Sequence, residues 1–234
     1  MKIMNIRYFF LLTFCLLTIS QSKAQVDEEQ TGAWYIYNWG TGFGESRFGA
    51  QGDIQYRNWN LGGDLEQLLI RGGVTYSPSA ANVKFVLGYG HITSGAFGES
   101  DATSGEHRVY QEANLPQKLG NKFFLNHRFR YEQRWVETQD FRTRYRYNLS
   151  LTLPLNQNDL SKNAIYLAIY NELFINGQRH IGEGRTVELF DRNRLYGALG
   201  YSLRDNLKLQ LGYMEQTTDN LNKGQLQVSL HHTF

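Results

Sequence analysis

The sequence predicts an all-β protein, a closed antiparallel transmembrane β-barrel of 10–12 strands in an outer membrane. Three observations predict it. Apolar and polar residues alternate along most of the chain after about residue 33, many alternating segments exceed ten residues, and an export signal precedes them. Strict alternation describes a strand with one apolar and one polar face. A membrane-spanning strand needs about 9–11 residues, whereas ordinary globular strands average about 5–6.

Composition excludes several other classes of protein. The 234 residues include 24 Lys and Arg and 22 Asp and Glu. The chain therefore lacks the excess of positive charge that binding to a nucleic acid requires. The mean hydropathy of −0.49 argues against a bundle of membrane helices, each of which needs about 20 mostly apolar residues in a row. The aromatic content of 14% is too high for a disordered chain.

The first segment in chain order has the features of a secretory signal peptide, which we assign to residues 1–24. Lys2 and Arg7 form its positive region, residues 8–19 are apolar, and a small-residue cleavage site ends at Ala24. An uncleaved membrane anchor is the alternative, and the shortness of the apolar run argues against it.

A short polar leader, residues 25–32, follows the signal, and residues 33–234 form the barrel domain. The only cysteine, Cys15, lies within the apolar run of the signal. The exported chain therefore has no disulfide framework and must be stabilised in other ways.

Eleven strand-like segments follow in order along the barrel domain. The first carries Tyr35, Tyr37 and Trp39 on one parity. The clearest alternation lies in residues 141–153, where Phe, Tyr and Leu face one way and Arg, Asn, Ser and Thr the other. The segments are 33–39, 45–59, 65–77, 82–93, 105–115, 122–136, 140–154, 163–176, 187–203, 205–217 and 223–234.

The breaks between these segments alternate in length. Residues 77–81 and 203–206 are tight turns, whereas residues 93–105 and 176–186 are long, polar and rich in glycine. Short turns on one side and long loops on the other are typical of an outer-membrane barrel, which usually has an even number of strands. We therefore expect 10 or 12 strands, with one segment split or missed, or with an irregular start before residue 39.

The last segment ends the chain on an aromatic residue. Leu226, Val228, Leu230 and the terminal Phe234 share one parity. A final amphipathic strand of this kind is similar to the signal read by the outer-membrane assembly machinery. We therefore expect Phe234 to act as a membrane-assembly signal.

The apolar parity is expected to face lipid. A spanning sheet must satisfy every backbone group internally and have no free edge, so it closes. Tyr and Trp residues near the strand ends would form the aromatic girdles. The alternative is a soluble barrel or sandwich that buries the apolar parity inside, which would not explain the strand lengths.

The polar parity is unusually rich in arginine. Its side chains would line the interior, where adjacent strands bring residues about 5 Å apart and guanidinium forks pair with carboxylates. One interpretation is a packed salt-bridge core, another is a basic constriction that selects anionic solutes, and a third is a pocket near the extracellular rim. The predicted charge network is Arg57, Arg71, Arg108, Arg128, Arg130, Glu132, Arg134, Arg142, Arg144, Arg146, Glu172 and Arg194, with Glu106 and Glu112 on the matching parity.

Signals for catalysis are weak. There is no Gly-x-Ser-x-Gly elbow and no His-x-x-x-His zinc pair, so we assign no catalytic residue, metal or cofactor. An enzyme acting on lipid or peptide, a hydrolase or acyltransferase, would need a site built from scattered residues at the extracellular rim. His91, Ser94, Ser100 and His107 flank one long loop, and His180 and Glu183 lie in the other.

Several motifs in combination carry a family resemblance. They are His127-Arg128-Phe129-Arg130-Tyr131-Glu132-Gln133-Arg134-Trp135, Arg142-Thr143-Arg144-Tyr145-Arg146-Tyr147, Tyr170-Asn171-Glu172-Leu173-Phe174 and Phe190-Asp191-Arg192-Asn193-Arg194-Leu195-Tyr196. Over about residues 30–234 the chain resembles a family of uncharacterised outer-membrane β-barrel proteins, a domain of unknown function frequent in Bacteroidota. The resemblance implies the barrel and its location, and it implies no activity.

The function expected from the sequence is an integral outer-membrane barrel, either a narrow pore or a structural barrel with an interior lined by Arg and Glu. The rim enzyme is the alternative. The expected partners are outer-membrane lipid, the assembly machinery and a small anionic solute, with no nucleic acid and a monomeric state.

Overall fold

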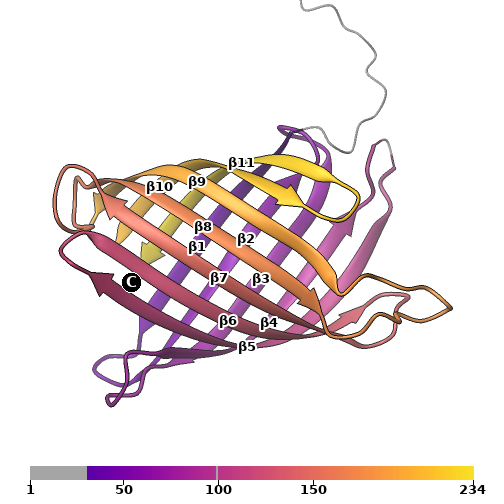
Figure 1. The fold of residues 1–234 in the computed structure, drawn as a ribbon, viewed down its shortest axis with the longest axis horizontal. Coiled ribbons are helices and arrows are strands. Elements are labelled where there is room, and N and C mark those ends of the chain that lie inside the picture. Colours follow the sequence, from indigo (N-terminus) through magenta and orange to yellow (C-terminus); the bar gives the residue numbers. More distant parts are fainter. Residues whose placement is uncertain (1–30, 99) are drawn as a thin grey trace, which may run out of the picture.

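The computed structural model describes residues 31–98 and 100–234, which form a closed all-β barrel (Figure 1). The predicted fold class is therefore confirmed. The predicted signal peptide, 1–24, and all but the last two residues of the predicted leader, 25–32, lie outside the described residues. Within the described part of the chain, no helix has the length and apolar character to cross a membrane.

Eleven strands form the wall, and each matches one of the segments expected from alternation. They are long because their polar and apolar parities continue over most of the distance from one rim to the other. The strands are β1 (Gly32–Gly42), β2 (Phe48–Asn58), β3 (Leu65–Tyr76), β4 (Lys84–Gly95), β5 (Thr103–Leu119), β6 (Phe123–Val136), β7 (Arg142–Pro154), β8 (Ile165–Asn176), β9 (Phe190–Arg204), β10 (Leu207–Thr217) and β11 (Asn222–Thr233).

The expectation of an even number of strands is wrong. Ten seams of the barrel are antiparallel, but β1 pairs with β11 in parallel, from Gly32 opposite Gln225 to Gly40 opposite Thr233. A parallel closing seam lets an odd number of alternating strands close, so no segment was split or missed. The first segment is a regular strand with a partner on each side.

The odd strand count places the two ends of the wall at opposite rims. We call the rim where β11 ends the C-terminal rim and the other the N-terminal rim, where the long β8–β9 connection projects (orange in Figure 1). The C-terminal rim carries the connections 43–47, 77–83, 120–122, 155–164 and 205–206, and the N-terminal rim carries 59–64, 96–102, 137–141, 177–189 and 218–221.

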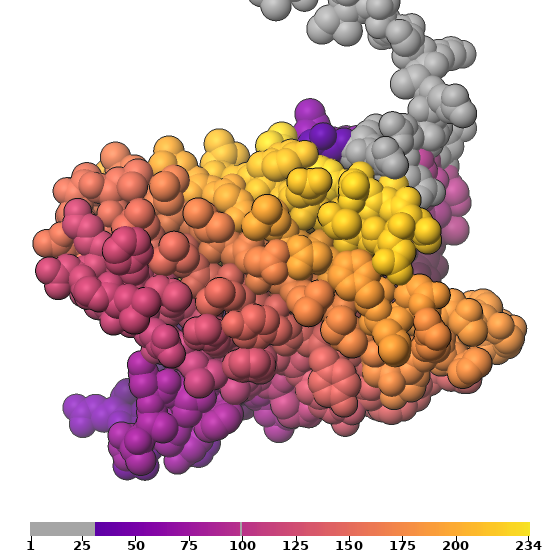
Figure 2. All heavy atoms as spheres, viewed as in Figure 1, coloured from indigo at the N-terminus to yellow at the C-terminus, as the bar shows by residue number. Residues whose placement is uncertain are grey.

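The outer surface of the wall is apolar. Leu211 is 61% exposed and lies opposite Leu199 and Val228, and Leu199 lies opposite Leu167. All four side chains are exposed, so they form an apolar row across four strands. Figure 2 shows this side of the barrel as a continuous surface, with the β8–β9 connection standing out from it.

The interior contains one aromatic cluster, on the side formed by β1 and β8–β10. Trp34, Tyr166, Tyr196 and Met214 are buried there together with small alanines. Gly200 is needed beside Tyr166, because a Cβ at this glycine would lie 2.2 Å from Cζ of the tyrosine ring. The rest of the interior is largely polar.

Candidate functional site

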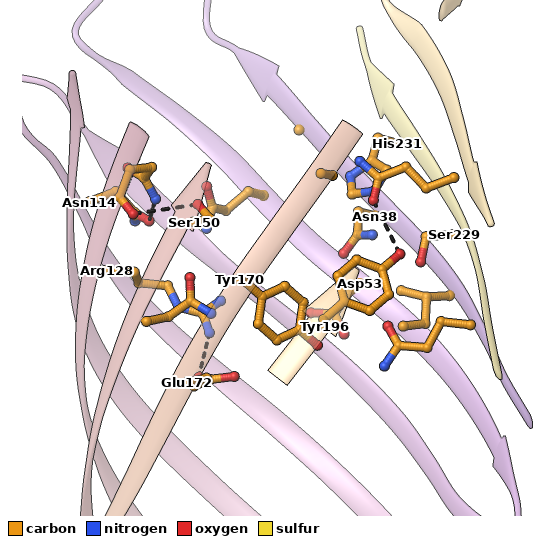
Figure 3. A pocket seen from close by; sticks show the side chains of 18 of the residues that line it. Asn38, Asp53, Asn114, Arg128, Ser150, Tyr170, Glu172, Tyr196, Ser229 and His231 are labelled. Carbon is orange, nitrogen blue, oxygen red and sulfur yellow. Dashed lines mark hydrogen bonds and ion pairs between the residues drawn. The ribbon is translucent and has the colours of Figure 1, made fainter. Parts of the chain in front are cut away.

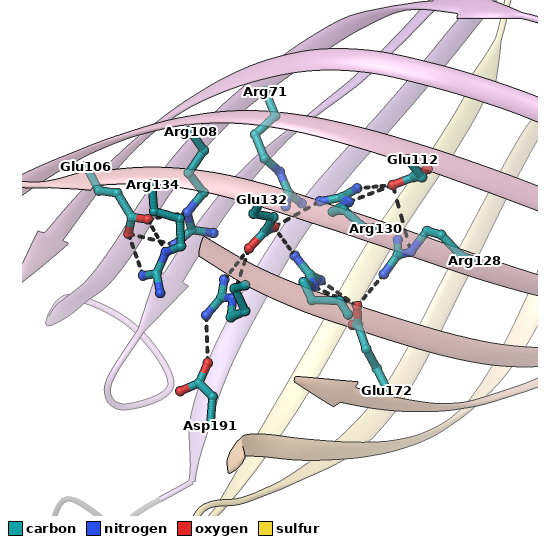
Figure 4. Close-up of polar contacts among 12 residues, drawn as sticks. Arg71, Glu106, Arg108, Glu112, Arg128, Arg130, Glu132, Arg134, Glu172 and Asp191 are labelled. Carbon is teal, nitrogen blue, oxygen red and sulfur yellow. Dashed lines mark hydrogen bonds and ion pairs between the residues drawn. The ribbon is translucent and has the colours of Figure 1, made fainter. Parts of the chain in front are cut away.

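Inward-facing arginines and glutamates of β5, β6 and β7 form a charge network with two groups of ion pairs, one around Glu106 and one around Glu132 (Figure 4). The register places like charges directly opposite one another, with Arg108 facing Arg134 and Arg130 facing Arg146. Like charges in such positions destabilise a sheet. The arrangement therefore requires carboxylates shared between the arginines.

Glu106 supplies the first of these shared carboxylates, near the N-terminal rim. Its Oε1 lies 2.5 Å from Nε of Arg108 and 2.5 Å from Nε of Arg134. Its Oε2 accepts a second hydrogen bond from each of the two guanidinium groups. Two facing arginines are thus bound in bidentate fashion by one anion, the geometry in which guanidinium and carboxylate pair best.

Glu132 is the centre of the network and is 0% exposed. Arg144 donates to its Oε2 at 2.7 Å, Arg146 donates to its Oε1 at 2.7 Å, and Arg130 lies 3.6 Å from Oε1. Arg144 also pairs with Asp191 at 2.7 Å. The charge of one buried carboxylate is therefore balanced by guanidinium groups from its own strand and from β7.

Glu172 extends the network toward the C-terminal rim. Its Oε1 accepts hydrogen bonds at 2.6 Å from Nη2 of Arg146 and from Nη2 of Arg128. Glu112 pairs with Arg130 at 2.5 Å. Every carboxylate on this side of the interior therefore contacts at least one arginine from another strand.

A second group of charges lies on the opposite wall. Asp53 pairs with Arg71 at 2.8 Å, and Gln55 accepts hydrogen bonds from Arg57. The Arg57 guanidinium lies 3.6 Å from the centre of the Trp34 ring, a cation–π contact.

Several side chains in the half of the interior toward the N-terminal rim are almost completely buried. At this level Leu69, Ile92 and Phe174 are almost completely buried, as is Glu132. Asn58, Gln225 and Lys223 fill the mouth next to Glu66, with Nζ of Lys223 3.7 Å from the Glu66 carboxylate. Side chains therefore occupy this half.

The half toward the C-terminal rim holds a polar chamber of about 630 Å³ (Figure 3). All eleven strands contribute to its lining, which reaches rim residues such as Gly40 and Thr233 and is bounded inside by Arg130 and Arg146. Leu160, from the connection 155–164, lies at the edge and packs against the aromatic cluster.

The twelve predicted network residues all lie on the inward parity. Ten are buried, and Arg128 and Arg142 are half-buried. Arg57, Arg71 and Arg194 lie apart from the main cluster, with Nε of Arg194 bonded to Gln216 at 2.9 Å. Phe234 is 68% exposed, and its amide donates to the carbonyl of Gly40 across the parallel seam.

The structure brings the candidate histidines His91 and His107 together but places Ser94 on the other face of the wall. The rings of His91 and His107 lie 4.8 Å apart on the outer face, with Tyr89 Oη 2.5 Å from Nδ1 of His107. Ser94 faces inward, where its hydroxyl accepts a hydrogen bond from Gln67. A histidine base and a serine nucleophile are thus on opposite sides of the wall.

The second candidate loop, residues 176–186, also does not form a catalytic arrangement. His180 pairs with Thr186 in an isolated β-bridge, and Glu183 forms an exposed ion pair with Arg185. In the part of the chain that the structure describes, no group of His, Cys, Asp and Glu side chains could hold a metal ion.

Three acidic partners were not among the predicted site residues. Asp53 lies on the polar parity of its strand and could have been found there. Asp191 and Glu66 could not, because strict alternation assigns both to the outer face. Each lies at a register shift, of β8 against β9 and of β2 against β3, where a bulge turns the side chain inward.

The fold and this interior together define a closed β-barrel protein with an apolar outside and an ion-paired inside. A family model described as "Protein of unknown function (DUF2490)" matches residues 31–227, and the chain belongs to this family. No curated protein matches the sequence.

Proposed function

We propose that this protein is an integral outer-membrane β-barrel whose interior is plugged by its own ion pairs. One observation carries the proposal: the polarity of a soluble protein is inverted. Charged side chains such as Glu132 and Arg144 are buried, while Leu87 and Leu211 are about 60% exposed. Monomeric soluble proteins rarely expose large contiguous apolar patches, whereas hydrocarbon provides the solvent that such a surface needs.

The plug supports a structural or gated barrel over an open pore. A conducting pore needs a continuous water path, and the half toward the N-terminal rim is filled by buried side chains. Reconstitution of the purified barrel in planar bilayers tests this. We expect no stable conducting state in the current recordings. A stable anion-selective conductance of the unmodified protein would contradict the plug.

The lipid-facing assignment is tested by fluorescence at matched positions. The described chain contains no cysteine, so Leu211→Cys and the neighbouring Gln210→Cys each introduce one labelling site once the signal is removed. Gln210 lines the chamber and Leu211 faces outward. A polarity-sensitive dye at position 211 should be quenched by brominated lipid, and the dye at position 210 should not. Equal quenching at both positions would refute the assignment.

The orientation follows the lengths of the connections. We propose that the N-terminal rim, with its long connection 177–189, faces outside, and that the C-terminal rim faces the periplasm. A membrane-impermeant maleimide applied to intact cells should label Gly184→Cys and spare Gly120→Cys. The reverse pattern would invert the proposed topology.

The assembly machinery is the proposed partner of β11. Leu226 and Val228 face outward on this strand, and the exposed Phe234 ends it. The change Phe234→Ala should lower the yield of folded barrel in cells without lowering the stability of barrel refolded in detergent. Loss of stability in detergent would instead assign Phe234 a packing role.

A further inference from the structure

The chamber at the C-terminal rim has far more positive than negative side chains. Eight of its lining residues are Lys or Arg and three are Asp or Glu. The three carboxylates, Asp53, Glu112 and Glu172, are each held by at least one arginine. The excess of positive charge remains even when Glu132, behind the chamber wall, is counted with them.

Two buried guanidinium nitrogens at the inner end of the chamber make no hydrogen bond among the described residues. Nε of Arg128 lies 3.9 Å from the Glu112 carboxylate and Nη1 of Arg130 lies 3.6 Å from the Glu132 carboxylate, so both form ion pairs that are too long for a hydrogen bond. Both arginines line the chamber, and Arg130 is more than nine-tenths buried. An anion at this end of the chamber would add negative charge and acceptor atoms beside two guanidinium groups whose hydrogen bonding is incomplete.

The neutral part of the lining suits hydroxyl groups. Asn, Gln and Ser side chains from several strands face the chamber, together with tyrosines 110, 166, 170 and 196. The amides and serines include Asn38, Gln51, Asn148, Ser150, Gln210 and Ser229. Amides donate and accept hydrogen bonds, as hydroxyl groups do, and the aromatic rings offer flat apolar surfaces.

We propose that this chamber binds a small hydroxylated anion, a sugar-sized solute that carries a carboxylate or a phosphate. The volume of about 630 Å³ lies within the range of about 300–1,000 Å³ found for small-molecule sites. The anionic group meets Arg128 and Arg130, and the hydroxyl groups meet the amides and tyrosines. This inference concerns a binding site, and it does not depend on the proposed membrane location.

Entry is from the C-terminal rim. Lys84 and Lys208 line the chamber at the rim ends of β4 and β10, and Nζ of Lys208 donates to the carbonyl of Asp205. Two positive side chains at the entrance attract an anion before it reaches the inner arginines.

Calorimetric titration of the folded barrel in detergent tests the proposal, with glucose 6-phosphate as the probe. Glucose and inorganic phosphate serve as partial ligands. We expect glucose 6-phosphate to bind more tightly than either, with an affinity that falls as salt is raised. No binding by a barrel shown to be folded would overturn the proposal, and equal affinity for inorganic phosphate would overturn the role of the neutral lining.

Two variants and a control locate the site. Arg128→Gln removes a donor at the inner end of the chamber, while Glu172 keeps its ion pair with Arg146. We expect the affinity for glucose 6-phosphate to fall about tenfold or more, as for the loss of a hydrogen bond to a charged group. The double change Lys84→Gln and Lys208→Gln tests the entrance should Arg128→Gln fail to fold. Lys162→Gln, an exposed lysine at the same rim, is the matched control. Equal affinity in the control and the other variants would refute the site.

Discussion

Neutralising the buried carboxylate at the centre of the network should destabilise the barrel strongly. The change Glu132→Gln keeps the volume of the side chain and removes a charge that is 0% exposed. Two guanidinium groups lie 2.7 Å from its oxygens. A pair of charges about 4 Å apart interacts by about 4 kcal/mol at an effective dielectric constant of about 20.

The net loss is smaller than two such interactions. Glutamine avoids the cost of burying a carboxylate, which is several kcal/mol. Arg144 keeps Asp191 and Arg146 keeps Glu172, so neither arginine is left without an acidic partner. We therefore expect a loss of about 3 kcal/mol in the free energy of unfolding, the lower end of the range seen when one partner of a buried pair is removed.

Equilibrium unfolding in urea, with the barrel in lipid vesicles and tryptophan fluorescence as the readout, measures this loss. Glu183→Gln is the control, because the pair between Glu183 and Arg185 is exposed and such pairs contribute about 0–1 kcal/mol. A loss below about 1 kcal/mol for Glu132→Gln would refute the idea that the network stabilises the barrel as a unit.

Two further predictions concern packing and a rim connection. Gly200→Ala should lower the free energy of unfolding by about 1–3 kcal/mol, because its Cβ meets the ring of Tyr166. Gly197→Ala, on the same strand with no atom within 4 Å of the new Cβ, should change it little, and equal effects in urea unfolding would contradict this reasoning. The hydroxyl and amide of Ser161 donate to Asp159 and lower the pKa of that exposed carboxyl group. Ser161→Ala should therefore raise the pKa of Asp159, measured by an NMR titration. In the unmodified protein the hydrogen bonds from Ser161 to Asp159 should persist at neutral pH and be lost as the pH falls through the pKa of Asp159 in the folded state. An unchanged pKa in the variant would refute the assignment.

Much of the interior could be predicted because the strands have a strict period of two. Once Tyr145 and Tyr147 were assigned to one face, Arg144 and Arg146 had to lie on the other. The same rule fails at Glu66 and Asp191, where a bulge adds one residue to the strand and reverses the face. Alternation carries no signal for such a local insertion.

The sequence alone determined the positions of the strands and the chemistry of their two faces, because a β-strand points successive side chains to opposite sides. Only the tertiary structure decided that the barrel has eleven strands, since the parallel pairing of β1 with β11 joins segments from the two ends of the domain. It also decided which arginine meets which carboxylate, as in the pair of Arg144 with Asp191, 47 residues apart. Closure of the sheet brings such distant residues to one place, and it divides the interior into a packed half and a chamber.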